Sequence, residues 1–352
     1  MIVINYATDI VKATIDTLKA SDISLTLKAT HRVAIKPNLV IASPASGGAT
    51  THPQVVEGII LFLKEYGVSH ISIMEGSWVG DCTKRAYKRC GYEDLAQDYG
   101  LSLIDLKDDT YQTLSAHGYD ISICDSALET DFLINVPVLK GHCQTGLTCC
   151  MKNLKGCIPD KEKRRFHSLG LHKPIATLNT LLRPGYCVVD GICGDLNFEE
   201  GGTPVVSNRI LAGSNPLLID SFAAHLIGYQ PEEIGYLVHG REMGLGDFFN
   251  EQTNIVELNR EQKPTTDPKS SRILDKYKGF IKEDAACSAC YSALAYALYH
   301  LRGKPSETLH IGQGFRGVNA TGFGIGNCAK SFSQYVPGCP PKATDIIHAL
   351  NL

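Results

Sequence analysis

Four cysteines in the last part of the chain have the number and spacing of a metal site. Cys287 and Cys290 form a C-S-A-C pair, Cys328 follows in G-N-C, and Cys339 lies in P-G-C-P-P. Thiolate sulfur binds iron and zinc, and a C-x-x-C turn can hold one metal ion or two irons of a cluster. The set therefore predicts a metal centre that uses all four side chains.

The order of these cysteines favours an iron–sulfur cluster. A pair followed by two single cysteines is unusual for structural zinc, which prefers two close pairs, whereas cubane clusters commonly use four cysteines with a proline after the last one. Residues 324–341 also resemble the cluster-binding stretch of the small subunits of respiratory complex I and nickel hydrogenases, which end in P-G-C-P-P as well. We expect a [4Fe–4S] cluster, with zinc and buried structural thiols as the alternatives.

Two histidines in the central segment, residues 139–172, are candidates for proton transfer. His142 follows an apolar run, residues 131–138, that is typical of a buried strand, and His167 follows the basic run K-E-K-R-R. Imidazole changes charge near neutral pH, so each histidine can act as acid, base or metal ligand. The alternative is that both are hydrogen-bonded loop residues beside a solvated basic loop.

Two lysines in the same segment are candidates for binding an anion. Residues 146–154 are predicted to form a helix that Gly156 ends, which places Lys152 and Lys155 on one face. We assign Lys152 a catalytic role and Lys155 a cofactor-binding role. The alternative is that both are solvated and only favour the negative end of the helix dipole.

Three more polar residues end predicted strands. Lys36, Glu75 and Asp190 each lie at the carboxyl end of an apolar run. Open α/β sheets build their sites at this edge, so we assign all three to the catalytic group with His142. The alternative for each is a solvated or purely structural residue.

A glycine-containing loop precedes the next candidate position. The loop of residues 42–51 leads into a predicted helix of residues 53–66, for which Thr51 and Gln54 form a capping box. Because helix amino ends bind anions, we expect Thr51 and His52 to contact a phosphate or carboxylate of a cofactor. The alternative is that both residues only cap the helix, and no Walker motif is present.

The order of the predicted elements sets the fold class. Strands and helices alternate, which predicts an α/β fold: a mostly parallel, multi-layer sheet with helices on both faces, plus a small cysteine-rich α/β module near the carboxyl terminus. Residues 1–6 are predicted to be an edge strand. The motif G-Q-G-F-R-G at residues 312–317 has no helix after it, so we interpret it as a loop for close backbone packing rather than a dinucleotide site.

The predicted domain boundaries follow the composition. Residues 259–271 are polar, contain two prolines and lack apolar spacing, which is typical of a linker. We therefore expect an α/β domain over residues 1–258 and a cysteine-rich iron–sulfur module over residues 272–352.

The composition excludes several classes of protein. The 352 residues are 43% apolar and 20% charged with a net charge of −3, an ordinary globular balance that does not suit a general nucleic-acid binder. No apolar run reaches the ~20 residues that span a bilayer, and the first residues lack the pattern of a signal peptide. Thirteen cysteines without that signal favour metal or redox use in a reducing cytoplasm, with a small anionic ligand or a redox protein as partner.

Several motifs resemble the domain-of-unknown-function family 362 (DUF362). They are K-G-H, T-G-L-T, M-K-N-L-K-G and R-R-F-H in the central segment, with K-P-N, T-H-P, V-V-D-G and E-E-G-G-T-P elsewhere. The resemblance covers roughly the first 240 residues, and the family name declares no activity.

A more distant likeness is to the lactate racemase family, which uses a nickel-pincer cofactor. Its pattern of a histidine, a glycine four residues later and a lysine ten residues after the histidine is similar to His142, Gly146 and Lys152, with His167 as a further histidine. Two adjacent cysteines stand where that pattern has paired glycines. The resemblance implies a nickel-type cofactor that pairs with or is bonded to Lys152.

Three functions follow from these residues. The first is an iron–sulfur redox protein that transfers electrons between the cluster and a ligand or partner at the α/β cleft. The second is a lactate-racemase-like metallocofactor enzyme for proton or hydride transfer on a small carboxylate, which Lys36 would hold. The third is a non-catalytic binding protein with a structural cluster or zinc. We favour the first, an oxidoreductase, over the second, an isomerase.

Overall fold

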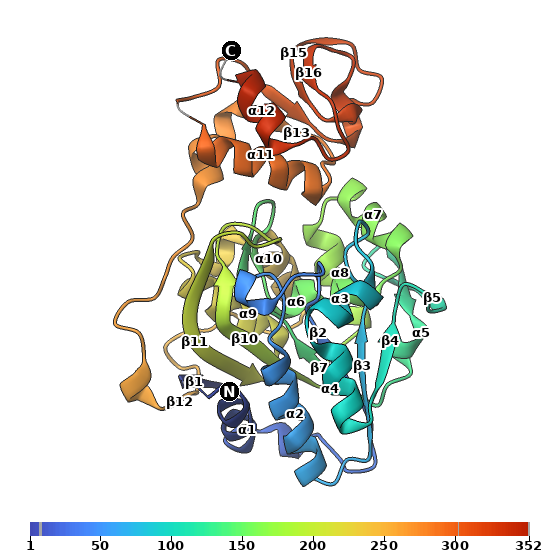
Figure 1. Cartoon of the computed structure of the whole chain (residues 1–352), viewed down its shortest axis with the longest axis vertical. Helices are drawn as coiled ribbons and strands as arrows, with labels where there is room; N and C mark the ends of the chain where they lie inside the picture. The colour runs from blue at the N-terminus through green and yellow to red at the C-terminus, as the bar shows by residue number, and fades with distance from the viewer. Residues whose placement is uncertain (7–8, 302, 351–352) are drawn as a thin grey trace.

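The computed structural model describes residues 1–6, 9–301 and 303–350 and shows one large sheet of eight strands (Figure 1). Its strands are β1 (Ile2–Tyr6), β2 (Arg32–Pro37), β3 (His70–Glu75), β4 (Ser102–Asp105), β7 (Phe132–Val136), β10 (Tyr186–Asp195), β11 (Pro204–Gly213) and β12 (Ile255–Leu258). Their order is β12-β1-β11-β10-β7-β2-β3-β4. Within this sheet, among the described residues, only β11 runs antiparallel to its neighbours. The predicted α/β class is confirmed.

Helices cover both faces of this sheet, and each face has its own hydrophobic core. One core lies under α1 (Ile10–Lys19), α2 (Pro53–Glu65), α3 (Thr83–Arg89) and α4 (Tyr92–Tyr99). The other lies under α5 (Asp125–Leu128), α6 (Cys150–Asn153), α7 (Asp160–Ser168), α8 (His172–Leu181), α9 (Pro216–Leu226) and α10 (Gly235–Glu242). Successive side chains of a strand point to opposite faces of the sheet, so each central strand contributes to both cores. In β2, Val33 and Ile35 belong to the first core and Ala34 to the second.

Two predicted elements of the main sheet are wrong. Strand β1 is not an edge strand, because β12 returns from far along the chain and pairs parallel with its outer side. The predicted helix over residues 146–154 begins instead as a hairpin of β8 (Lys140–His142) and β9 (Gly146–Thr148). Gly146 has a φ of +75°, which permits the tight turn, and only then do α6 and the 3₁₀ turn η3 (Leu154–Cys157) follow.

Two local predictions near the sheet edge also differ from the structure. Thr51 does not cap α2: its hydroxyl donates to the carbonyl of Val136 at 2.8 Å and accepts the backbone N–H of Asn38 at 2.8 Å. The basic run before His167 is not a loop but the helix α7, whose apolar residue Phe166 is fully buried. The sequence analysis also omitted the hairpin of β5 (Tyr111–Ala116) and β6 (Tyr119–Cys124).

The residues after 280 form a second, smaller α/β unit, the C-terminal module, drawn in orange and red in Figure 1. Its parallel sheet has the order β13 (Ile281–Glu283), β14 (Leu309–Ile311), β15 (Ala320–Ile325) and β16 (Phe332–Val336), with α11 (Ser288–His300) and α12 (Ala343–Leu350). The module has its own hydrophobic core. The predicted cysteine-rich α/β unit is therefore present, while the exact domain boundaries stay a prediction.

The motif G-Q-G-F-R-G behaves as predicted. It contains only the 3₁₀ turn η8 (Gln313–Phe315) before the chain enters β15. A Cβ atom on Gly312 would lie 1.8 Å from the carbonyl oxygen of Asp284, so glycine is needed there for close backbone approach.

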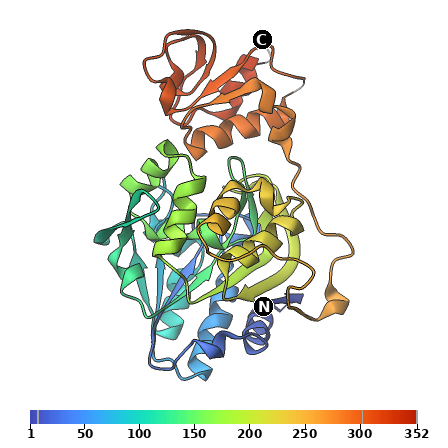
Figure 2. The same ribbon diagram turned by 180° about the vertical axis from the view of Figure 1, so that it is seen from behind.

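The segment that precedes the module runs along the side of the main unit (Figure 2). It is anchored there by Asp267, whose Oδ1 lies 2.7 Å from Nη2 of the buried Arg209 on β11. The backbone N–H of Ser270 donates to the carbonyl of Ile227 at 2.9 Å. The predicted linker is thus fixed to the surface at these points rather than free along its whole length.

The β8–β9 turn holds the module against the large sheet. The amide of Gln144 donates to Glu283 Oε1 at 2.7 Å and to the carbonyl of Ala286 at 3.1 Å, and it accepts the hydroxyl of Ser288 at 2.8 Å. Since one side chain bonds to three module residues on both sides of Cys287, it fixes the start of α11 relative to the main unit.

An aromatic contact strengthens this junction. Phe198 packs against Tyr296 and Tyr299 of α11, with ring centroids 5.6 and 5.9 Å apart. Beside it, Ser292 donates to Glu200 Oε2 at 3.0 Å. The loop between β10 and β11 therefore contacts both the large sheet and the module.

We predict that Gln144→Ala loosens the module without unfolding the large sheet. Loss of three hydrogen bonds, two of them part-buried and the one to Glu283 exposed, is expected to lower the local free energy of opening by about 1–3 kcal/mol. Hydrogen exchange followed by mass spectrometry should show faster exchange in β13 and the start of α11. Gln112→Ala, which removes one exposed bond to Asp125 within the main unit, is the matched control and should leave both segments unchanged.

Candidate functional site

A cavity of about 440 Å³ lies at the carboxyl ends of β2 and β3, and both the main unit and the C-terminal module line it. Six basic side chains and two acidic ones face it. The basic ones are Lys36, Lys152, Lys155, Lys163, Arg164 and Arg316, and the acidic ones are Glu75 and Glu199. Cys287, Cys290 and Cys339 line the same cavity, so the two predicted groups of residues meet there.

A buried ion pair forms the floor of the cavity. Lys36 Nζ lies 3.1 and 3.0 Å from the two carboxylate oxygens of Glu75, and both side chains are almost fully buried. Glu75 also accepts the backbone N–H groups of Leu39 and Gly76 at 3.0 and 2.7 Å. Because the carboxylate accepts from three donors, one ammonium and two backbone N–H groups, its charge is well satisfied away from water. The pair ties the ends of two neighbouring strands together.

Gly156 fits against this pair. A Cβ atom there would lie 2.2 Å from Glu75 Oε1 and 2.5 Å from Lys36 Nζ. The predicted role of Gly156 as a helix-ending residue is wrong, because it lies inside η3 and does not have a positive φ. Glycine is required there for space, so that η3 can pack onto the ion pair.

A second network joins the β8–β9 hairpin, α6 and the loop after β10. His142 Nε2 lies 2.8 Å from Glu199 Oε2, and Lys152 is bonded to the other oxygen of the same carboxylate. Lys152 also donates to Thr148 Oγ1 at 3.2 Å. His142 Nδ1 accepts the backbone N–H groups of the next turn, which fixes the ring as the neutral tautomer with its proton on Nε2.

Burial and charge set the protonation of this network. Burial lowers the pKa of His142 to about 4, although Glu199 opposes the shift. Burial alone would raise the pKa of Glu199, but His142 and Lys152 outweigh it and hold that pKa well below the usual range. At neutral pH His142 is therefore a neutral imidazole and Glu199 a carboxylate.

Lys155 and His167 form the least satisfied part of the cavity. Burial, with the charge of Lys152, lowers the pKa of Lys155 to about 7, and no hydrogen-bond partner for its ammonium is found among the described residues. Burial, with Lys155 and His142, lowers the pKa of His167 to about 2. Its Nδ1 is buried without a partner in the described part of the chain. These two groups are free to meet a ligand.

Thr51, His52 and Asp190 do not line this cavity. Asp190 Oδ2 accepts the backbone N–H of His52 at 2.7 Å and lies 2.8 Å from its Nδ1, while Asp190 Oδ1 accepts the N–H of Ile192 at 3.0 Å. Burial lowers the pKa of His52, but the bond to Asp190 more than offsets this and raises it overall. The three residues hold the start of α2 against β7 and β10, behind the cavity.

Sequence reasoning missed two of the charged residues. Glu199 lies in the E-E-G-G-T-P loop that was expected to edge the cleft, yet nothing in its spacing shows that it bonds to both His142 and Lys152. Lys163 was interpreted as part of a basic surface run, but α7 buries it, and its ammonium donates to the carbonyls of Gly76 and Ser77 at 3.0 and 2.9 Å. Its helical spacing from Phe166 was the available signal.

The four predicted cysteines come together at the module side of the cavity. Cys287 precedes α11, Cys290 lies in its first turn, Cys328 lies in the 3₁₀ turn η9 (Asn327–Ala329), and Cys339 follows β16. All four are free thiols. Burial raises the pKa of Cys290 to about 12, with the charges of the other three cysteines adding to it, so the four sulfurs are near neighbours.

The module cysteines do not form a compact ligand set in this structure. Among the described residues, only Cys149, Cys150 and Asp220 bring at least three such ligand atoms within 4.8 Å of one another. No three of the four module sulfurs are therefore that close together.

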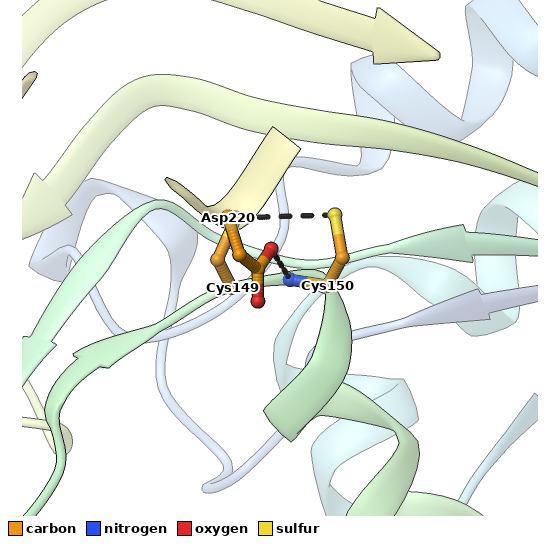
Figure 3. A group of neighbouring side chains, drawn as sticks. All are labelled: Cys149, Cys150 and Asp220. Carbon is orange, nitrogen blue, oxygen red and sulfur yellow. Dashed lines mark hydrogen bonds between the residues drawn. The ribbon is translucent and has the colours of Figure 1, made fainter. Parts of the chain in front are cut away.

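The Cys149, Cys150 and Asp220 group has a structural explanation (Figure 3). Asp220 accepts the backbone N–H groups of Cys150 and Met151 at 2.7 and 2.9 Å, so it caps the first turn of α6, the helix that carries Lys152. The two sulfurs lie 3.9 Å apart because Cys149 is still outside the helix. Burial raises the pKa of Cys149 to about 12, which keeps it a thiol, the weaker ligand form.

The profile of the family "Domain of unknown function (DUF362)" matches residues 33–225, more than half of the chain. The chain belongs to the DUF362 family. The matched range carries all of the polar cavity residues of the main unit, from Lys36 to Glu199, whereas the four module cysteines lie outside it.

This DUF362 protein is similar, at low sequence identity, to a curated protein and to solved structures. The thylakoid-associated protein sll1697 of Synechocystis sp. is 24% identical over 242 residues, which cover 67% of this chain and 75% of the relative. The lactate racemase apoprotein of Thermoanaerobacterium thermosaccharolyticum has a similar structure, with a TM-score of 0.44 and 13% identity over 66% of this chain and 57% of that one.

A protein from Thermotoga maritima has a TM-score of 0.37 at 12% identity, over 57% of this chain and 53% of that one. The DUF362 chain therefore spans less than two thirds of either solved structure. Among the described helices, none has both the length and the hydropathy needed to cross a bilayer.

We predict that Lys36→Met destabilises the DUF362 protein by about 3–5 kcal/mol, because it leaves the buried Glu75 carboxylate without its counter-charge. Urea unfolding followed by circular dichroism measures this. The double variant Lys36→Met/Glu75→Leu removes both charges and should recover a large part of the loss. Equal destabilisation by the double variant would contradict the assignment of the cost to an unpaired charge.

We also predict that Lys155→Met stabilises the protein by roughly 1–3 kcal/mol at pH 7. The folded-state pKa of Lys155 is about 7, below its unfolded value of about 10.4, so the unfolded chain binds more protons between these values. The cost of burying Lys155 is therefore full at low pH and fades as pH rises toward 10. Urea unfolding at pH 6.5 and 9.5 should show a smaller gain at the higher pH, and Lys161→Met, at an exposed position on α7, should show no such trend.

Proposed function

We propose that this protein is an iron–sulfur redox protein, in which Cys287, Cys290, Cys328 and Cys339 hold a [4Fe–4S] cluster beside a binding site for a small anionic ligand. A single observation carries the proposal: three of the four cysteines line the same cavity as the lysines and His167. When bound, such a cluster accepts and donates single electrons. A ligand in this cavity would lie close to the cluster, as electron transfer between the two requires.

The residues of the module fit a [4Fe–4S] cluster. Four free cysteines lie near one another at three separate turns of the module, and four is the number of cysteines that a [4Fe–4S] cluster commonly uses. Arg316 donates to Cys328 Sγ at 3.4 Å, so a basic side chain of the cavity lies against one of the four sulfurs. All thirteen cysteines are free thiols, which suits the cytoplasmic location that we propose.

The charge of the cavity supports an anionic ligand. Two of its six basic side chains are balanced by Glu75 and Glu199, and Lys163 is held by backbone carbonyls. Lys155, Arg164 and Arg316 are left to attract negative charge. Arg164 and Arg316 are exposed, so they attract an anion at the cavity edge, while Lys155 lies deeper.

The residues of the main unit would divide the remaining roles. Lys152 and Lys155 bind the ligand, Lys36 and Glu75 keep the floor of the cavity in place, and His142 stays neutral beside Glu199 to hold Lys152. His167 can donate or accept one hydrogen bond to the ligand. Thr51, His52 and Asp190, assigned to cofactor binding and catalysis from the sequence, would act only by positioning the strand ends.

A second candidate function is proton or hydride transfer on a small carboxylate with a nickel-type cofactor, as in an isomerase. It is favoured by the meeting of Lys152, His142 and His167 at one site. In that function the module cysteines would hold a structural cluster or zinc. The metal content of the protein separates the two candidates.

We predict that anaerobically purified protein contains about four irons and four sulfides per chain and has a broad visible absorption that bleaches with dithionite. Cys339→Ala should lose most of this iron and colour, whereas Cys82→Ala, at an exposed cysteine in the main unit, should keep both. Metal analysis and visible spectroscopy measure this. One zinc per chain without colour, or nickel that is lost in Lys152→Ala, would overturn the redox proposal.

A further inference from the structure

Lys155 differs from the other lysines near the cavity in having no partner. Lys36 pairs with Glu75, Lys152 pairs with Glu199, and Lys163 donates to two carbonyls. Lys155 Nζ has neither an ion pair nor a hydrogen bond in the described part of the chain, and its recorded neighbour is the ring of Phe166, with 6.0 Å between Nζ and the ring centroid. The amine therefore faces the cavity unoccupied.

The surroundings keep this amine in its reactive form. Burial and the adjacent ammonium of Lys152 both disfavour a second positive charge, and they lower the pKa of Lys155 to about 7. A lysine that is desolvated next to another cation is the usual arrangement for an amine that attacks carbonyl compounds. His167 lines the same cavity with an unpartnered Nδ1, ready for one hydrogen bond to an oxygen of the ligand.

We propose that Lys155 is a nucleophile that forms a Schiff base with a carbonyl ligand, of which 2-oxo acids are the class that fits. The carbonyl provides the electrophile, and the carboxylate suits a cavity with six basic and two acidic side chains. This inference goes beyond the proposed function: it uses the same anion-binding cavity but needs neither the cluster nor an electron.

The step balances without any further reagent. The neutral amine of Lys155 forms a bond to the carbonyl carbon, and the carbonyl oxygen gains the proton that nitrogen loses, giving a carbinolamine. Loss of that hydroxyl with one proton as water then gives the imine. Hydrolysis reverses both stages and returns the free amine and the 2-oxo acid.

No other lysine combines these features. Burial lowers the pKa of Lys140 to about 8, but its ammonium donates to the carbonyls of Ala49 and Glu199 at 2.7 and 2.8 Å, and it does not line the cavity. Lys152 is held by Glu199 and Thr148. At pH 7 an ordinary exposed lysine has about a thousandfold less neutral amine than Lys155.

The test is reductive trapping on the full-length protein at pH 7. The protein as purified is incubated with pyruvate and sodium cyanoborohydride, and the adduct is counted by intact mass and located by peptide mapping. We expect one reduced adduct per chain, on Lys155, and none with lactate, which has no carbonyl. Lys155→Arg keeps the charge but removes the nucleophile, so the adduct should fall at least tenfold, while Lys161→Arg, at an exposed position on α7 outside the cavity, should still form it on Lys155.

Two outcomes overturn the inference. One is an adduct spread over exposed lysines of the wild-type protein with no preference for Lys155, which peptide mapping shows without any variant. The other is an unchanged adduct yield in folded Lys155→Arg. Because the trapping needs no metal, its failure is distinct from that of the iron–sulfur proposal, which metal analysis decides.

Discussion

The buried pair of Lys36 and Glu75 is the interaction on which the site depends. It joins the carboxyl ends of β2 and β3, accepts the backbone turn after each strand, and provides the surface on which η3 packs through Gly156. A buried ion pair is costly unless each charge is fully satisfied, and here backbone N–H groups and a carbonyl complete the shell. A buried ion pair is not expected to be more stabilising than apolar residues of the same size. We therefore interpret the pair through the segment that it positions, the turn η3 that packs on it.

Contacts that start from this ion pair position α6 and the charged side chain that it carries into the cavity. Asn153 lies against Lys36, which sets the end of α6, and Asp220 sets its beginning. Lys152 is then placed to meet Glu199 from the β10–β11 loop. Lys155 has no carboxylate partner among the described residues, and burial, then the charge of the neighbouring Lys152, lowers its pKa to about 7. The low pKa of this lysine therefore depends on both the packing around it and the cation beside it.

The sequence predicted the fold class and most of the strand ends because period-two apolar runs and turn residues are local signals. Lys36, Glu75, Lys152, Lys155 and His167 line one cavity, because parallel strand ends and one short segment share an edge, while their assigned roles stay a prediction. It failed where a contact between distant residues decided the structure. Nothing near Gly146 shows that a hairpin displaces a helix, nothing near β1 shows that β12 returns beside it, and the partner of Glu199 is set only by the assembled fold. Asp190 was expected at a strand end, but β10 continues to Asp195, and the Asp190 carboxylate bonds to His52 instead of lining the cavity.

The junction held by Gln144 has a consequence for how the chain is made. The cavity has walls from both the large sheet and the residues after 280, and the family match ends well before the second wall begins. During synthesis, the lysines and His167 emerge and can pack long before the cysteines leave the ribosome. Until the module docks, the cavity lacks its second wall. Residues made well after the lysines therefore complete the site, and the main unit alone cannot enclose a ligand there.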